Sequence, residues 1–362
     1  MPMFQTSVRS GLSIAAVAAT VLLASCATPE PEPVAAPPPP PPPAVTLNEG
    51  VAEAASIYVT FIREVGSIQA GFPDAESIQA AIRRGAAYEP AQLSRGMIAY
   101  GSILALQSPE FVSGVRTYAV DPAQRQRMVE RIIADPAYAA TFPGADAAAG
   151  LIVSVIGKDS AALMTIANAV EEDAYTIQGR GDPRRRWAST HIQRREDRLE
   201  GAKSLSAVQM LPSAEEAARL FAAANSGTGL SLTAAETGPP YTPAVVNSLA
   251  IAALAALGAG GEDARANTEA LAVESNSEFC LNMSKLMLFQ CLAASRPSYE
   301  DIFCVGRHIM RDLATCTAGN ITPVPRITPA PDTAVAGAGG ISSPIAAGAA
   351  AASVNAIQTA SR

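Results

Sequence analysis

The chain has 362 residues, enough for one large domain or two modest ones, and alanine dominates the 49% that are apolar, whereas aromatic residues make up only 5%. Alanine has the highest helix propensity, and runs rich in β-branched and aromatic residues are scarce, so the composition predicts an all-α fold. A net charge of −7 excludes the global basic surface that is typical of nucleic-acid-binding proteins.

The first 26 residues predict an export signal. Arg9 is the one early charge, an apolar stretch runs from Leu12 to Leu23, and residues 23–26 read Leu-Ala-Ser-Cys. The stretch is shorter than the roughly 20 apolar residues of a membrane-spanning helix, which favours a cleaved signal peptide. Its last four residues resemble the lipobox of bacterial lipoprotein precursors.

This resemblance covers residues 1–26 only, and it implies that Cys26 carries lipid. In that class the signal peptide, here 1–25, is removed before the cysteine, whose sulfur and new amine are acylated. Three acyl chains exceed the roughly two lipid signals that stable anchoring needs. Because Ala27 rather than aspartate follows, the resemblance implies the outer membrane, with the mature chain facing the periplasm. An ordinary secretory signal with a chance cysteine is the alternative.

Residues 26–45 predict the lipid anchor and a stiff tether. Several prolines precede an unbroken run from Pro37 to Pro43. Such a run adopts polyproline II at about 3.1 Å per residue, so about fifteen residues would hold the folded body roughly 45 Å from the lipid surface. A ligand for a proline-binding module is the alternative.

Residues 46–260 predict a helical body. Asp74 precedes an amphipathic segment, while Ser108, Asp121 and Asp135 each precede a proline, so that a side-chain oxygen caps free N–H groups and proline takes the first helical position. The expected helices span 109–119, 122–134, 136–142, 145–178, 213–225 and 244–257. The last of these is apolar nearly all round and too short to cross a bilayer, so we expect it at the centre of the body.

Residues 261–319 contain the four remaining cysteines and predict an antiparallel helical hairpin. An even number of cysteines in an oxidising compartment favours two disulfides, for which three pairings exist. Cys280 and Cys291 would lie about 16.5 Å apart on one helix, and Cys304 and Cys316 about 18 Å apart on the next. The similar spans favour the pairs Cys280–Cys316 and Cys291–Cys304.

The second arm of this hairpin raises two further expectations. Ser298 with Asp301 resembles a capping box that opens the helix after Arg296-Pro297. Twelve residues at 100° each place Cys316 about 120° round the helix from Cys304, so we expect the last turn to tighten or tilt. A metal site formed by these thiols and His308 is the alternative, but closely spaced cysteine pairs are absent, so no metal is predicted.

Residues 180–203 are locally basic, with eight basic against four acidic side chains. One interpretation is a docking patch for an anionic partner, such as lipid head groups, lipopolysaccharide, wall polymer or an acidic protein face. The other is a solvated helix with internal ion pairs. The candidate patch comprises Arg184, Arg185, Arg186, Trp187, Arg194, Arg195 and Arg198.

Catalytic motifs are missing from the sequence. His191 and His308 are the only histidines, and neither lies in a recognisable catalytic frame. The segment from Gly150 to Asp159 has the wrong spacing for a phosphate loop and is expected to be helix core. Residues 171–173 are three consecutive acids, which are expected to face water. No catalytic or cofactor-binding residue is therefore assigned, and no cofactor is expected.

The sequence thus predicts a lipid-anchored, periplasm-facing structural or adaptor protein that presents a helical surface. Its expected partners are the membrane, through the N-terminal lipid, and an envelope protein or an anionic wall or lipid surface, but not nucleic acid. A carboxylate-dependent cell-wall or glycan-directed enzyme and a carrier of hydrophobic ligands are the alternatives. Residues 320–362 are rich in Ala, Gly, Pro and Ser and are expected to be a disordered tail.

Overall fold

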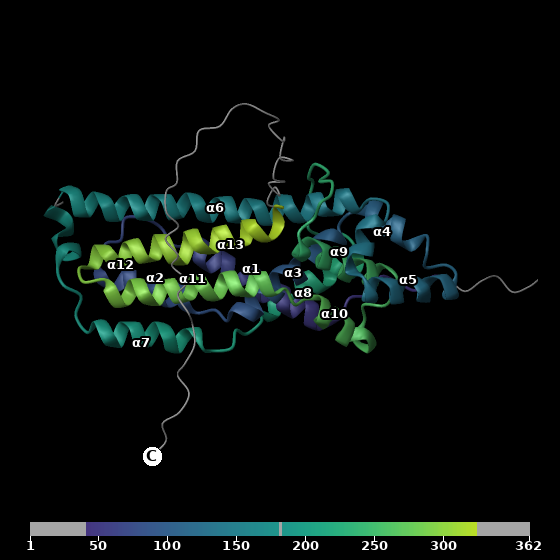
Figure 1. Ribbon diagram of the computed structural model, residues 1–362, viewed down its shortest axis with the longest axis horizontal. Coiled ribbons are helices and arrows are strands. Elements are labelled where there is room, and N and C mark those ends of the chain that lie inside the picture. The colour runs from purple at the N-terminus through teal and green to yellow at the C-terminus, as the bar shows by residue number, and fades with distance from the viewer. Residues whose placement is uncertain (1–40, 181–182, 324–362) are drawn as a thin grey trace, which may run out of the picture. The chain divides into compact units, whose positions relative to one another are not determined.

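The computed structural model describes residues 41–180 and 183–323 (Figure 1). The signal peptide, most of the tether and the tail from residue 324 lie outside the described residues. The described residues from Pro42 onward belong to one compact unit, in which they form helices and two isolated β-bridges but no strand. The all-α fold is therefore confirmed.

The helical elements follow one another in chain order, most of them with short connections, and the longest connection is 227–242, between α8 and α9. They are α1 (Glu49–Gly66), α2 (Ala75–Ala86), α3 (Pro90–Ala105), α4 (Pro109–Arg116), α5 (Pro122–Ala134), η1 (Pro136–Thr141), α6 (Ala145–Arg180), η2 (Pro183–Ser189), α7 (Arg195–Ser206), α8 (Ala214–Ser226), α9 (Pro243–Ala256), η3 (Glu262–Ala264), α10 (Arg265–Leu271), α11 (Ser275–Ala294), α12 (Ser298–Cys304), η4 (Val305–Arg311) and α13 (Asp312–Ile321).

The helix starts that the sequence predicts are confirmed. Asp74 caps α2 with a complete capping box, and Ser108, Asp121 and Asp135 each accept a hydrogen bond from a backbone N–H of the element that follows. Two of these predictions were wrong in part. The helix that begins at Pro109 ends at Arg116 rather than 119. The segment that begins at Pro136 is the 3₁₀-helix η1 rather than an α-helix.

Helix α9 lies at the centre of the unit, as its apolar composition predicts. Eleven of its fourteen residues are buried. The segment before α1 lies against the far end of α9, because Thr46 N–H donates to the Ala255 carbonyl over 3.0 Å and Asn48 N–H donates to the Gly260 carbonyl over 2.9 Å. The described start of the body is thus fixed to its core.

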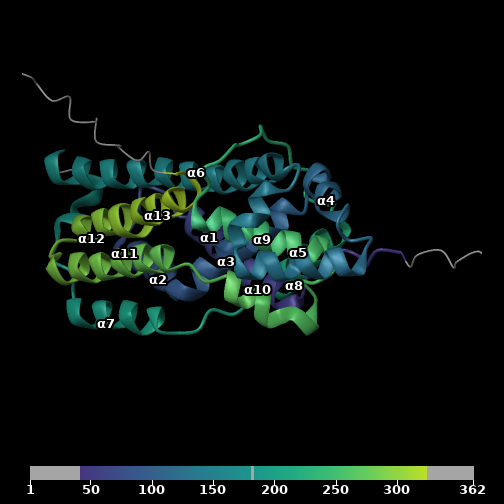
Figure 2. The same cartoon turned by 45° about the vertical axis from the view of Figure 1, so that its right-hand side comes forward.

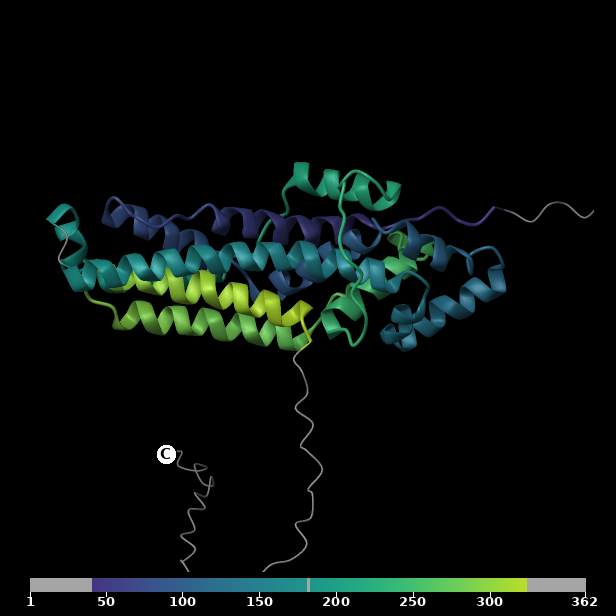
Figure 3. The same ribbon diagram turned by 90° about the horizontal axis from the view of Figure 1, so that it is seen from above.

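The hairpin arm α12–η4–α13 lies between α6 and α11, and the three run side by side (Figures 1 and 3). Helix α7 packs against α2 and α11, on the side of α11 that lies away from α6 (Figure 2). Gly306 of η4 permits a close approach to α6, since a Cβ there would lie 2.8 Å from the Glu171 Cγ. The hairpin therefore packs along the second half of α6.

Among the described residues one helix, Ala145–Gly179, is long and apolar enough to cross a membrane, judged by length and composition alone. Core helices of soluble proteins pass the same test. In this unit 39% of its most apolar window is buried, and the Ser160 hydroxyl donates to the Ala314 carbonyl over 2.7 Å. Its apolar surface is thus used in part to pack against α13.

Candidate functional site

Two disulfides join α11 to the second arm of the hairpin. Cys280 is bonded to Cys316 and Cys291 to Cys304, with Cα–Cα distances of 5.7 and 5.8 Å. These are the two pairs that the matched helix spans favour. Cys304 and Cys316 are buried, whereas the two cysteines of α11 are half-buried. The bonds hold the two arms together at both ends.

The second arm is not a uniform α-helix. Between Cys304 and Cys316 the seven residues of η4 form a π-helix. A π-helix turns by only about 85° per residue, so seven such residues remove about 105° and leave the two cysteines about 15° apart. The expected tightening of the last turn was wrong, because a wider turn in the middle of the arm brings both sulfur atoms to face α11.

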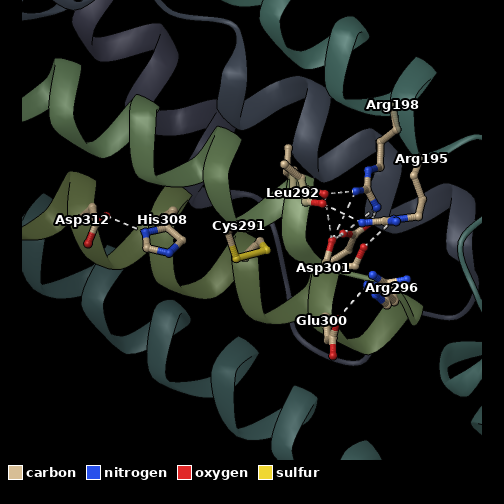
Figure 4. The surroundings of a disulfide bond; sticks show 12 residues. Arg195, Arg198, Cys291, Leu292, Arg296, Glu300, Asp301, His308 and Asp312 are labelled. Carbon is tan, nitrogen blue, oxygen red and sulfur yellow. Dashed lines mark hydrogen bonds and ion pairs between the residues drawn. A yellow bond between two sulfur atoms is a disulfide. The ribbon is translucent and has the colours of Figure 1, made fainter.

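A buried ion pair lies where the hairpin turns (Figure 4). The Arg198 guanidinium of α7 donates to both carboxylate oxygens of Asp301, over 2.8 and 2.6 Å, and these side chains are 4% and 1% exposed. The Ser295 hydroxyl and the Gln79 amide donate to the same carboxylate, over 2.6 and 3.2 Å. Burial raises the pKa of Asp301, which the charge of Arg198 opposes.

The same ion pair shows that the predicted capping box was wrong. Pro297 is the N-cap of α12, and no side chain caps this end. The Asp301 carboxylate instead turns toward α7, where the Arg198 guanidinium and the Ser295 hydroxyl bind it. The Ser298 N–H donates to the Thr190 carbonyl over 3.3 Å.

Arginines of α7 also close the C-terminal end of α11. Arg195 donates to the Ser295 carbonyl over 2.7 Å and to the Ala293 carbonyl over 2.6 Å, while Arg198 donates to the Leu292 carbonyl. The last carbonyls of a helix lack helical partners and carry partial negative charge, so two guanidinium groups stabilise this end. We call Arg195, Arg198, Ser295 and Asp301 the hairpin clamp.

The predicted basic patch contains both arginines that are bound inside the protein and arginines that are exposed. Arg195 and Arg198 are engaged inside the protein, and Arg185 forms an ion pair with Asp173 of α6. Arg186 and Arg194 are exposed. The side chain of Arg184 lies outside the described part of the chain. The described side chains thus include both internal ion pairs and exposed cations.

Trp187 and the two histidines each contact other parts of the described protein. Trp187 is half-buried against the core, and its buried indole N–H has no hydrogen-bond partner among the described residues. His191 is exposed and forms an isolated bridge with Pro297. The His308 Nδ1 lies 2.9 Å from an Asp312 carboxylate oxygen, and the described residues contain no group of three or more potential metal ligands.

The acidic residues 171–173 point in different directions, as expected, but not all of them face water. The Glu171 carboxylate is buried and accepts a hydrogen bond from Arg311 of η4 over 2.6 Å. Asp173 pairs with Arg185, and Glu172 is exposed. The expectation of three solvated acids was therefore wrong, since neighbouring elements supply a cation for two of them.

A cavity of about 420 Å³ opens between α1, α3, α6 and α8. Asp159 of α6 lines it and makes no hydrogen bond or ion pair with any described residue, and burial raises its pKa to about 6. Tyr100 of α3 also lines it, and burial, then the charge of Asp159, raises the pKa of its phenol to about 12. We call this the Asp159 cavity.

Sequence reasoning missed both the hairpin clamp and the Asp159 cavity. The only signal for the cavity is Asp159 in a largely apolar stretch of α6, which was assigned to helix core. Comparison with known proteins adds no relative, since no family model, no curated protein and no solved structure matches the chain.

Proposed function

We propose that the mature chain is a lipid-anchored adaptor of the bacterial envelope, tethered through Cys26 and facing the periplasm. Four of the five cysteines are consumed in two disulfides, so Cys26 is the one left for acylation. Disulfides persist in oxidising compartments such as the periplasm. The lipobox, the proline tether and the paired cysteines support the same location.

The observation that carries an adaptor role is the outer face of α11. Phe279, Leu286 and Met287 are 67%, 45% and 36% exposed. At 100° per residue these three positions fall within an arc of about 100° on one side of the helix. Large apolar side chains gathered on one exposed helix face are typical of protein–protein contact surfaces.

The rest of α11 is fixed, which prepares the outer face for binding. Two disulfides hold its cysteines, and the buried Lys285 ammonium donates to the Tyr88 carbonyl and, over 2.9 Å, to the Ser206 carbonyl. A rigid surface loses little conformational entropy on association. The partner that fits is an envelope protein with an apolar face of its own, within reach of the tether.

In-cell photo-crosslinking tests this proposal. A photoreactive residue in place of Phe279 or Leu286 should give one discrete protein adduct, whereas the same residue in place of Gln126, exposed on α5, should give none. The adduct from position 279 should disappear when Leu286→Ser and Met287→Ser are added, and it should disappear in the unanchored Cys26→Ser chain.

Two results would contradict the proposal. An equal adduct from position 126 would show that the contact is not specific to α11. Processing and membrane fractionation of Cys26→Ser like the wild type, with no palmitate incorporated into the wild type, would contradict the lipid anchor. Acylation gives an anchor that detergent releases and salt does not.

A further inference from the structure

The Asp159 cavity contains two polar groups without protein partners. Asp159 and the Tyr100 hydroxyl both line it, and neither forms a hydrogen bond with any described residue. Burial, and then the charge of Asp159, raises the pKa of the Tyr100 phenol, in keeping with their place in one cavity. Buried polar groups are ordinarily hydrogen-bonded, which indicates a partner from outside the chain.

Two guanidinium groups line the same cavity. Arg219 donates to Glu216 over 2.5 Å, and Arg63 donates to its other oxygen over 3.4 Å. Burial alone would raise the pKa of Glu216, but Arg219 and Arg63 lower it, so this carboxylate stays ionised and occupied. Two cations share one anion, which leaves a net positive charge and most of their N–H donors unused.

Asp159, Tyr100, Arg63 and Arg219 line the same cavity. The lone carboxylate and the two guanidinium groups therefore face one space, and their charges all affect the pKa of the Tyr100 phenol, after burial. The rest of the lining is largely aliphatic and includes Val59, Ile62, Leu163 and Ile166.

We propose that the Asp159 cavity binds a small zwitterion with an aliphatic side chain, such as an amino acid. Its ammonium group contacts Asp159, its carboxylate contacts Arg219 and Arg63, and its side chain packs on the aliphatic lining. The volume of about 420 Å³ lies within the range of about 300–1,000 Å³ that is usual for small-molecule sites. This activity is independent of the adaptor role proposed above.

Calorimetric titration of the full chain in detergent tests the proposal with three probes. L-leucine has both charges, L-leucinamide lacks the carboxylate, and N-acetyl-L-leucine lacks the ammonium. L-leucine should bind, and each analogue should bind about 10- to 100-fold more weakly, because each loses a hydrogen bond between charged groups. No heat or thermal stabilisation with L-leucine, or equal binding of either analogue, would overturn the proposal.

A matched pair of variants separates the site from the surface. Asp159→Asn should weaken L-leucine binding at least about 10-fold, whereas Asp263→Asn, which alters an exposed aspartate outside the cavity, should leave it unchanged. Asp159→Asn should fold normally, because the native carboxylate has no partner to lose. Unchanged binding by Asp159→Asn would overturn the assignment of the ammonium site.

The pH dependence gives an independent readout. Because burial raises the pKa of Asp159 to about 6, L-leucine binding should weaken as the pH falls through that value, and the Asp159→Asn variant should lose this dependence. Two other titratable groups at the cavity keep their protonation state over this range, because burial raises the pKa of Tyr100 to about 12, and Arg219 and Arg63 lower the pKa of Glu216 against the effect of burial. The remaining charged groups of the lining are those two guanidinium groups. Binding that is flat between about pH 5 and 7 would count against the proposal.

Discussion

Removal of the outer disulfide should destabilise the protein more than removal of the inner one. Cys280–Cys316 closes a loop of 36 residues, and Cys291–Cys304 closes a loop of 13 that lies wholly inside it. In the chain-entropy treatment these loops correspond to about 3.8 and about 2.9 kcal/mol at 25 °C. In the native protein each bond closes its loop in the presence of the other, which lowers both contributions by about 0.4 kcal/mol and preserves their difference of about 0.9 kcal/mol.

The assay is urea unfolding of two double variants without reductant. Cys280→Ala/Cys316→Ala should lose about 3.4 kcal/mol of unfolding free energy, and Cys291→Ala/Cys304→Ala about 2.5 kcal/mol. Each pair has one buried and one half-buried cysteine, so the packing losses are similar. An inner variant less stable than the outer one would refute the entropic reasoning. Four reactive thiols in the unreduced wild type would refute the disulfides themselves.

Three further changes test the packing around the hairpin. Gly306→Ala should destabilise the protein by about 1–3 kcal/mol, because the added Cβ would meet α6. Gly319→Ala, which has open space around it, should be neutral or stabilising. Thermal unfolding of the two variants compares these effects. Arg198→Met should cost about 3–5 kcal/mol in urea unfolding by leaving Asp301 unpaired, and adding Asp301→Leu should recover most of that loss. Because burial lowers the pKa of Lys285 to about 8, against about 10.4 in an unfolded chain, unfolding free energy should rise from about pH 8 to about pH 10, and Lys285→Met should abolish the rise.

The features that the sequence predicted well depend on local chemistry. Four helix starts are capped through contacts within three residues, by Asp74, Ser108, Asp121 and Asp135. The capping residue and the helix that it caps therefore lie in the same short segment of sequence. The burial of α9 follows from its all-round apolar surface. The two cysteine pairs followed from the helix rise in an antiparallel hairpin, because similar spans along the two arms place the cysteines opposite one another.

The features that the sequence missed depend on residues far apart in the chain. Asp301 looked like part of a capping box because Ser298 lies three residues before it, but Arg198, which lies 103 residues earlier in the chain, binds its carboxylate instead. Glu171 looked solvated because its cation, Arg311, is 140 residues away. Tertiary contacts of this kind override local preference and leave no spacing pattern to recognise.

The two arms of the hairpin place their cysteines at unequal intervals, eleven residues from Cys280 to Cys291 and twelve from Cys304 to Cys316. Two disulfides between antiparallel helices align when the cysteines are equally spaced on both helices. The second arm therefore contains one extra residue, which the wide turn of η4 accommodates. Deleting one residue from 305–311 would let this arm become an ordinary α-helix with both disulfides aligned. The hairpin can therefore lose a residue here without unpairing a cysteine, whereas a deletion in the first arm would worsen the mismatch.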